Sequence, residues 1–215
     1  MAPASRKARP YHHGDLAPAL LQAAERVLKR DGVEKLTLRA VAREAGVSHT
    51  APQHHFGDLT GLLSELAAIG FIRFHDTMLE EAAKATDPLT RGVALGRGYL
   101  RFARENPDMF LLMFRGARLD MKRPALAQAG DAAFAVLAAA RGVATPGQGM
   151  TLAQAANVTG SWAFVHGLAM LAIDKRLSFL VDALPPGTTE GDLIAATGQE
   201  MMARLGASRP DKARA

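Results

Sequence analysis

Residues 37–57 restrict the fold of this chain more than any other stretch, because they carry the signals of a helix-turn-helix. Thr37 is a typical N-cap, and the apolar residues after it recur every three or four positions, which predicts a helix with one buried face. Gly46 is expected to end that helix, since a left-handed residue after the last turn is cheap only for glycine. Ser48 is expected to cap a second short helix, which Phe56 closes onto the core.

The second helix of this pair is polar almost throughout. Side chains that hydrogen-bond and bury little are expected of a helix that lies in a DNA major groove. An ordinary solvated pair of helices ranks lower, because the capped helix, the Gly-Val-Ser turn and the polar second helix occur together. The residues expected to contact bases or phosphates are Ser48, His49, Thr50, Gln53, His54 and His55. Thr37 and Arg39 begin the first helix and are expected to contact phosphates, since a helix N-terminus favours anions.

The distribution of charge agrees with a nucleic-acid partner. The chain has a formal net charge of +5 and a sequence pI of about 9.9. Residues 1–57 hold nine Lys and Arg against five Asp and Glu, whereas residues 58–215 hold seventeen against sixteen. Most of the basic excess therefore lies beside the helix-turn-helix, where DNA phosphates would be. Arg6, Lys7 and Arg9 either reach phosphates or a minor groove, or form a solvated basic tail.

The composition excludes several kinds of site. Cysteine is absent, so disulfides and cysteine–zinc sites are excluded, and a reducing cytoplasm is expected. No stretch reaches the roughly 18 uninterrupted apolar residues of a membrane span, and no signal peptide precedes the first expected helix. His12 and His13 lack acidic partners at ligand spacing, which favours a solvated turn over a metal site. We expect no metal, no cofactor and no membrane partner.

The remaining sequence is punctuated as a series of helices. Asp87-Pro88 and Asn106-Pro107 each combine a cap with a proline, which ends one helix and starts the next. No strand pattern and no internal repeat occurs. The helices expected outside residues 37–57 span 16–31, 58–85, 88–105, 107–114, 124–141, 150–176 and 189–205. We therefore expect an all-α protein, with a basic arm and three-helix DNA-binding domain over residues 1–57 and a second helical domain over residues 58–215.

Small residues form a stripe along the helix expected over residues 150–176. Ala156, Gly160, Ala163 and Gly167 fall on one face and would let another helix approach closely. The last expected helix carries a second stripe, made of Ile194, Thr197, Met201 and Leu205. Two such helices from each of two copies would form a four-helix bundle, so we expect a homodimer. Its twofold axis would place two recognition helices about one DNA turn apart on a palindrome; the alternative is that both stripes pack within one subunit.

Aromatic and methionine residues recur in the helices after residue 58. The candidates for lining a small-molecule pocket are Phe74, Met78, Phe102, Phe110, Met113, Phe114, Phe134 and Trp162. The core interpretation ranks above the pocket interpretation for each of them, because helical stripes of Phe and Met usually belong to a core. His166 lies four residues after Trp162, so it either orients a ligand in such a pocket or is a core histidine bonded to its neighbours.

The motifs of the common enzyme classes are absent. The chain holds no Gly-x-Ser-x-Gly elbow, no P-loop and no Gly-x-Gly-x-x-Gly. Gly96-Arg-Gly98 lies inside a helical pattern and lacks the third glycine. His166 has no candidate nucleophile beside it other than Ser161. We therefore expect a binding protein and not an enzyme.

The order of these features resembles the TetR family of transcriptional regulators over essentially the whole chain. The most specific match is residues 11–66: a helix, then Leu-Arg-Ala-Val-Ala-Arg-Glu-Ala-Gly-Val-Ser, then His-His-Phe, then a long apolar helix. Trp162, His166 and Gly167 are similar to the Trp-His-Gly pattern of one C-terminal subgroup, and residues 11–16 and 106–110 are similar to it too. The resemblance implies an all-helical homodimer that binds a double-stranded DNA operator, usually as a repressor that a small-molecule effector releases. It also implies that residues 58–215 are a helical ligand-binding and dimerisation domain.

Three residues depart from the family pattern. Gln53 stands where the family usually has an aromatic residue that contacts a phosphate, and Leu59 stands where it usually has a lysine. Pro52 removes a backbone donor near the start of the second helix, so that helix is expected to begin late or to be distorted. These departures keep open a second interpretation, a helical protein-interaction module that has lost DNA binding.

Overall fold

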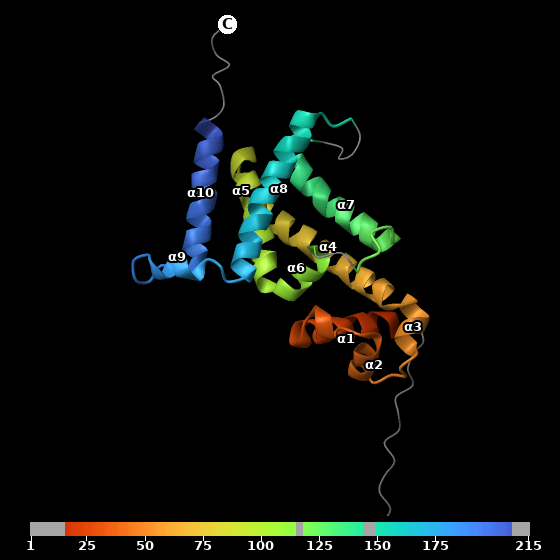
Figure 1. Cartoon of the computed structure of the whole chain (residues 1–215). Coiled ribbons are helices and arrows are strands. Elements are labelled where there is room, and N and C mark those ends of the chain that lie inside the picture. The colour runs from red at the N-terminus through yellow and green to blue at the C-terminus, as the bar shows by residue number, and fades with distance from the viewer. Residues whose placement is uncertain (1–15, 115–117, 144–148, 208–215) are drawn as a thin grey trace, which may run out of the picture. The chain divides into compact units, whose positions relative to one another are not determined.

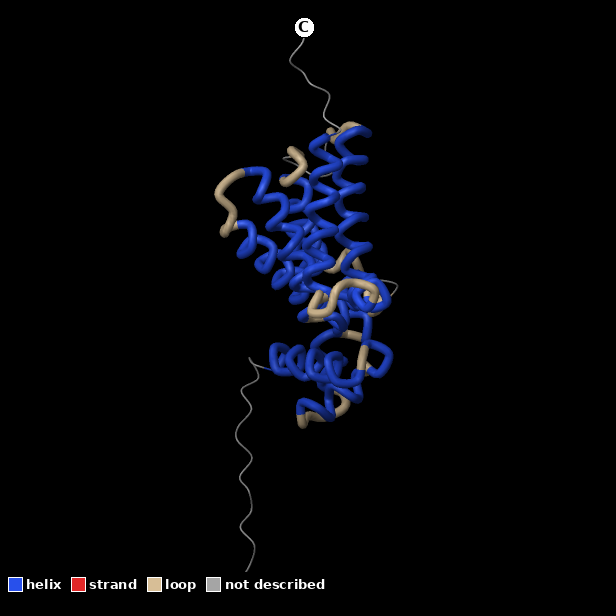
Figure 2. Tube along the Cα trace, turned by 90° about the vertical axis from the view of Figure 1, so that its left-hand side faces the viewer, coloured by secondary structure: helices blue, strands red, loops and turns tan. Residues whose placement is uncertain are grey.

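The chain folds into helices. The computed structural model describes residues 16–114, 118–143 and 149–207, without the side chains of 88, 89 and 202–207, and these ranges contain no strand (Figure 1). Figure 2 follows the same trace and distinguishes its helices from the connecting loops. The all-α fold class predicted from the sequence is therefore confirmed.

The helices follow one another in the order that the sequence predicts. They are α1 (Leu16–Asp31), η1 (Val33–Lys35), α2 (Leu38–Ala45), α3 (Ala51–Phe56), α4 (Leu59–Ala82), α5 (Pro88–Glu105), α6 (Pro107–Phe114), α7 (Pro124–Ala139), α8 (Leu152–Ile173), α9 (Ser178–Asp182) and α10 (Glu190–Ala207). The sequence does not predict η1 and α9, because three and five residues are too few to set up an apolar period.

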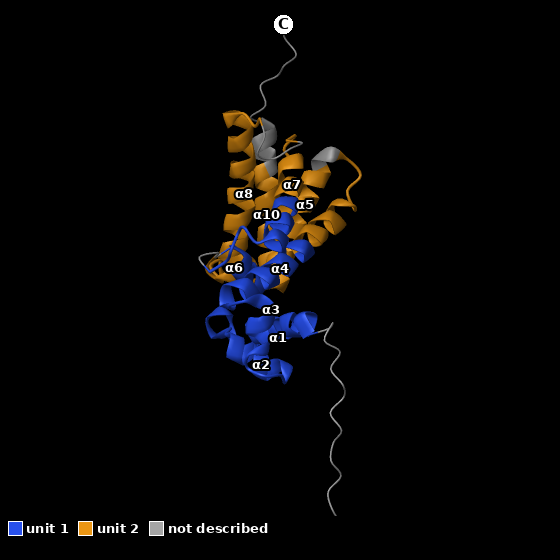
Figure 3. Cartoon of the chain, turned by 90° about the vertical axis from the view of Figure 1, so that its right-hand side faces the viewer, with its two compact units in different colours: residues 1–73, 108–132 blue, residues 74–107, 133–215 orange. Residues whose placement is uncertain are grey.

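Two compact units make up the chain, and each contains two segments of sequence (Figure 3). Unit 1 comprises Met1–Arg73 and Asp108–Ala132, and unit 2 comprises Phe74–Pro107 and Ala133–Ala215. Helices α4 and α7 contribute residues to both units. The predicted domains, residues 1–57 and 58–215, are divided by function and not by compactness, and this division stays a prediction.

The core of unit 1 combines the first three α-helices with the first half of α4. The buried side chains of α1 are Leu20, Ala23, Ala24, Val27 and Leu28, and those of α4 include Leu62, Leu63 and Leu66. Gly70 lets α6 approach α4 closely, because a Cβ there would lie 2.7 Å from the sulfur of Met113. A larger residue at position 70 would therefore require the side chains of Met109 and Met113 to shift.

Unit 2 has one buried cluster where α8 meets α5 and α10, and another where α7 meets α8. Leu168, Ala172, Leu177 and Ile194 form one buried cluster, and Ala138, Val143 and Val158 form another. Gly98 lets α5 lie against the backbone of α4, since a Cβ there would be 2.7 Å from the Cα of Met78. The capping box of Thr151 and Gln154 fixes the start of α8.

Among the described helices, α8 is long and apolar enough, by length and composition alone, to cross a membrane. The core helix of a water-soluble protein passes the same test. Val158, Leu168 and Ala172 of α8 belong to the two buried clusters of unit 2, so one face of this helix packs within the unit.

Candidate nucleic-acid interface and effector site

The first helix of the helix-turn-helix is capped at both ends as the sequence predicts. The Thr37 hydroxyl accepts a hydrogen bond from the Ala40 amide at 3.1 Å, and α2 begins at the next residue. Gly46 adopts the left-handed conformation at φ 69°, and its amide donates to the carbonyls of Ala42 and Arg43. Both caps confirm the predicted limits of this helix.

The prediction that Ser48 caps the second helix, and that His49 and Thr50 belong to it, is wrong. Helix α3 spans only Ala51–Phe56, and the Ser48 hydroxyl bonds instead to the Thr50 hydroxyl at 3.1 Å. Pro52 explains the difference, because proline is tolerated only in the first turn of a helix. Helix α3 therefore begins late, as the position of Pro52 predicts.

The turn and α3 separate buried anchors from exposed polar side chains. Pro52 and Phe56 are buried, which attaches this short segment to unit 1. The six residues predicted to contact bases or phosphates are all exposed: Ser48, His49, Thr50, Gln53, His54 and His55. Thr37 and Arg39 of the preceding helix are accessible as well. All eight can therefore reach a partner, and their contacts with DNA stay a prediction.

Ion pairs tie α1 to α2. Glu44 accepts from Arg26 Nε at 2.9 Å and from Arg30 Nη1 at 2.8 Å, and these hydrogen bonds, that of Arg30 first, lower the pKa of the Glu44 carboxyl. Within the described part of the chain, Arg39 and Arg43 form no ion pair. The charges of Arg39 and Arg43 are therefore the ones on α2 that a phosphate can neutralise.

The nine residues predicted to bind an effector lie in both units and are mostly core residues. Phe110, Met113 and Phe114 belong to unit 1, and Phe74, Met78, Phe102, Phe134, Trp162 and His166 belong to unit 2. Of these, Phe74, Met78, Phe102, Phe110 and Met113 are buried, and Trp162 is 38% exposed. A surface hollow in unit 1 is lined by α1 residues Gln22, Glu25, Arg26 and Lys29, and none of the nine lines it. The core interpretation of the five buried residues is supported, and their effector contacts stay a prediction.

A hydrogen-bonded group of three side chains lies within unit 2. The Tyr99 hydroxyl lies 2.8 Å from His166 Nδ1, and Trp162 Nε1 donates to the same hydroxyl at 3.3 Å. An indole nitrogen only donates, so the Tyr99 oxygen accepts from Trp162 and its proton is available to His166. Phe74 packs edge-on against Tyr99, with ring centroids 4.7 Å apart.

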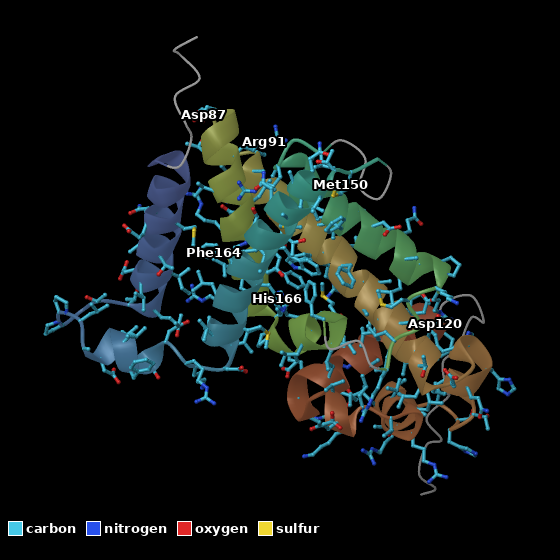
Figure 4. All side chains as sticks on the ribbon, turned by 45° about the horizontal axis from the view of Figure 1, so that its top comes forward. Asp87, Arg91, Asp120, Met150, Phe164 and His166 are labelled. Atoms are coloured by element: carbon cyan, nitrogen blue, oxygen red, sulfur yellow. The ribbon has the colours of Figure 1, made fainter. Side chains whose placement is uncertain are left out.

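Burial sets the protonation states of this group. It raises the pKa of the Tyr99 hydroxyl and lowers the pKa of His166, so both side chains are neutral near pH 7. Figure 4 labels His166 on α8. The bond with Tyr99 is what the core interpretation of His166 expects. Tyr99 lies one helical turn before Phe102, and the apolar pattern of the sequence does not single it out.

The small-residue face of α8 is open to solvent in the single chain. Ala156, Gly160, Ala163 and Gly167 are not buried, and a Cβ on either glycine would meet nothing within 4 Å. Leu152 and Leu171 on the same helix are 87% and 45% exposed. On α10, Ile194 is buried against α8 residues of its own subunit, and Thr197 and Met201 are partly buried. Leu205 lies outside the described side chains.

Several predictions concern residues that the structure does not describe. The basic arm with Arg6, Lys7 and Arg9, the pair His12 and His13, and the family-like segment 11–15 all lie outside them. Within the described ranges, no three His, Cys, Asp or Glu side chains gather as metal ligands would.

Two protein-family models match the chain. Residues 20–66 match the model of bacterial regulatory proteins of the tetR family, and residues 93–186 match the tetracyclin repressor-like C-terminal domain. No curated protein sequence matches the chain. Membership of the Trp-His-Gly subgroup stays a prediction.

Solved structures resemble the chain along nearly its full length. A protein of unknown function from Rhodococcus sp. RHA1 is 30% identical, with a TM-score of 0.70 over 92% of this chain and 98% of that one. The TetR family transcriptional regulator PfmR from Thermus thermophilus is 20% identical, with a TM-score of 0.57 over 86% and 97%. The fatty acid degradation regulator FadR from Bacillus halodurans is 12% identical, with a TM-score of 0.60 over 89% and 99%. The last two likenesses concern the fold alone.

Proposed function

Because the chain belongs to the TetR family of transcriptional regulators, we propose that it is a repressor that binds a palindromic operator and leaves it when a small molecule binds. Members of this family are DNA-binding transcriptional regulators and not enzymes. The proposal adds the operator symmetry, the sign of regulation and the effector control. It also places the protein in the cytoplasm, without a membrane partner or cofactor.

The observation that carries the proposal is the division of α3 and its preceding turn into buried and exposed faces. Pro52 and Phe56 anchor the segment, which leaves its polar side chains exposed. We assign base or phosphate contacts to Ser48, His49, Thr50, Gln53, His54 and His55. Thr37 and Arg39 are assigned phosphate contacts at the N-terminus of α2, where the amides and the basic side chain both favour an anion.

The dimer is proposed to form through α8 together with α10. The open face of Ala156, Gly160, Ala163 and Gly167 supports this, since small residues let helix backbones approach closely. Exposed Leu152 and Leu171 add apolar surface that a second copy would bury. Light scattering at micromolar concentration tests the assembly, and a monomer would contradict it.

The effector is proposed to bind unit 2 at the aromatic group of Phe74, Phe102, Phe134 and Trp162, with His166 as its polar contact. Helix α4 supports the coupling, because it runs unbroken from Leu59, three residues after Phe56, to Ala82 and carries Phe74 and Met78. A tilt of α4 would change the spacing of two recognition helices. By linkage, DNA would lower effector affinity by the same factor. Effector contacts of Phe110, Met113 and Phe114, which lie on α6 of unit 1, stay a prediction.

The experiment that tests the proposed function is a binding titration with DNA from upstream of the gene that encodes this chain. We expect sequence-specific binding that weakens steeply with salt. A screen for compounds that release the wild-type complex is then repeated with His166→Ala and Phe110→Ala, which should respond at higher concentration if still folded. Absence of specific binding by the folded dimer would favour the protein-interaction module, to which the short α3, Gln53 and Leu59 point.

A further inference from the structure

The connection between α6 and α7 contains a polar attachment to the DNA-binding unit. Arg118–Arg123, here called the strap, follows α6 and belongs to unit 1 although it lies far from the helix-turn-helix in sequence. Figure 4 labels Asp120 in the strap. Its contacts are made with the first turns of α4 and with η1, the element just before α2.

The central contact is a hydrogen bond to a fully buried serine. Ser64 of α4 is 0% exposed. Its hydroxyl donates to the Thr60 carbonyl at 2.7 Å and accepts from the backbone amide of Asp120 at 2.9 Å. Loss of this oxygen would leave the amide of Asp120 without its buried acceptor, which costs more than a surface contact does.

Two ion pairs flank this bond. Arg123 Nε donates to Glu65 at 2.6 Å, and both side chains are little more than a quarter exposed. Gly61 makes room for the same guanidinium, because a Cβ there would lie 3.0 Å from Arg123 Nη1 and 2.0 Å from the Phe56 carbonyl oxygen. Arg118 reaches Glu34 of η1 at 3.1 Å in a solvent-exposed pair, which contributes least.

The strap therefore meets both boundaries of the helix-turn-helix. At Gly61 it lies beside the last residue of α3, and at Glu34 it lies three residues before the N-cap of α2. Helices α2 and α3 have eight and six residues, too few to be stable alone, so their orientation depends on what they pack against. The geometry points to Ser64 and Arg123 as positioning residues for operator recognition, which hold α2 and α3 in register with α4 without contacting DNA themselves.

This inference rests on the proposed DNA binding, and its competitor is a strap that adds stability only. The first variant is Ser64→Ala, which changes no charge. Ser161→Ala is the matched control, because the Ser161 hydroxyl makes the same bond to the carbonyl four residues before it, Asn157, at 2.8 Å in α8. The second set is Arg123→Glu, Glu65→Arg and their combination, which restores the pair with the net charge of the wild type.

The measurement is fluorescence anisotropy with the operator duplex and with an unrelated duplex of equal length, each over a salt series. Ser64→Ala should weaken operator binding by about 5–30-fold, while binding to the unrelated duplex and the salt slope stay unchanged. Ser161→Ala should behave as the wild type. Each single reversal should lower the ratio of specific to non-specific affinity, and the combined variant should recover it.

An unchanged affinity ratio in Ser64→Ala, or a combined reversal no better than the single ones, would overturn the inference. A salt slope lowered in Arg123→Glu and still low in the combined variant would also overturn it, since Arg123 would then contact phosphate directly. Amide hydrogen exchange of residues 33–56 in the free protein is a second measurement, which needs no operator. If no duplex is bound by the wild type, the proposed function fails. Exchange that rises in Ser64→Ala within residues 33–56 more than in the rest of unit 1, with no such rise in Ser161→Ala, would still support the strap. Equal exchange in the two would overturn it.

Discussion

The helix-turn-helix and the aromatic group of unit 2 use polar side chains in opposite ways. Around α3, the polar residues are exposed while Pro52 and Phe56 are buried. In unit 2, the partly buried Tyr99 hydroxyl hydrogen-bonds to both His166 and Trp162 among aromatic rings. An exposed polar side chain contributes little to the fold, so its position calls for another explanation. A polar side chain that is hydrogen-bonded in a core already has a structural role. The comparison explains why sequence indicates a DNA interface more sharply than an effector site.

Truncating a buried ring of unit 2 should have the largest effect on folding. Phe102, 2% exposed and 5.3 Å from the ring of Phe74, is the test position. Phe102→Ala should lower the free energy of unfolding by about 3–5 kcal/mol, through lost burial and a cavity. Urea denaturation measures this, and Phe179→Ala is the control: Phe179 is 68% exposed, so the change should stay within about 0.5 kcal/mol. Equal losses would erase the distinction between core and surface aromatics.

Removing one oxygen from the hydrogen-bonded group should have an intermediate effect. Tyr99→Phe takes away the partner that Trp162 and His166 share, and it should cost about 1–3 kcal/mol of unfolding free energy. Trp162 is the only tryptophan in the chain, so its fluorescence reports on this site directly. We expect a shifted emission maximum in the folded variant. An unchanged spectrum and stability would mean that the hydroxyl contributes nothing to the group.

The same group should make stability depend on pH. Burial lowers the pKa of His166 below its ordinary value of about 6.5, so the unfolded chain binds more protons than the folded one just below that pH. The contribution of His166 to stability should therefore be complete above about pH 6.5 and decline as the pH falls towards the lower folded pKa. Urea denaturation from about pH 7.5 to about pH 5 checks this against His166→Gln, in which that part of the slope should vanish.

Exposed cations of the helix-turn-helix should affect DNA binding and leave folding unchanged. Arg39→Ala should keep the free energy of unfolding within about 0.5 kcal/mol and lower the salt slope of operator binding by about one. Arg26→Ala is the comparison, because Arg26 already pairs with Glu44 and should alter the slope less. Equal slopes for both variants and the wild type would remove Arg39 from the phosphate contacts.

The local features of α2 could be predicted because they depend on neighbours in sequence. The Thr37 cap and the left-handed Gly46 require only the residues within one turn. The prediction for Ser48 is wrong for an equally local reason, since Pro52 decides where α3 begins. A late start of α3 places Ser48 before the helix and leaves its hydroxyl to bond with Thr50.

The contacts of Tyr99, Ser64 and Arg123 could not be predicted in this way. Tyr99 meets His166 across 67 positions, and Ser64 meets Asp120 across 56. Such pairs depend on how distant helices pack, and apolar periodicity says only which face is buried. For the same reason the sequence does not single out effector residues, because a stripe of Phe and Met describes a core and a pocket equally well.

Selection of bound duplexes from a randomised DNA library tests the central claim, that α3 and its preceding turn read an operator, most directly. The wild type should select one palindromic motif. His49→Ala and Gln53→Ala should change the preferred bases within each half-site, whereas Arg39→Ala should select the same motif with lower affinity. The account would be contradicted if the folded protein selected no motif, or if the His49 and Gln53 variants selected the wild-type motif unchanged.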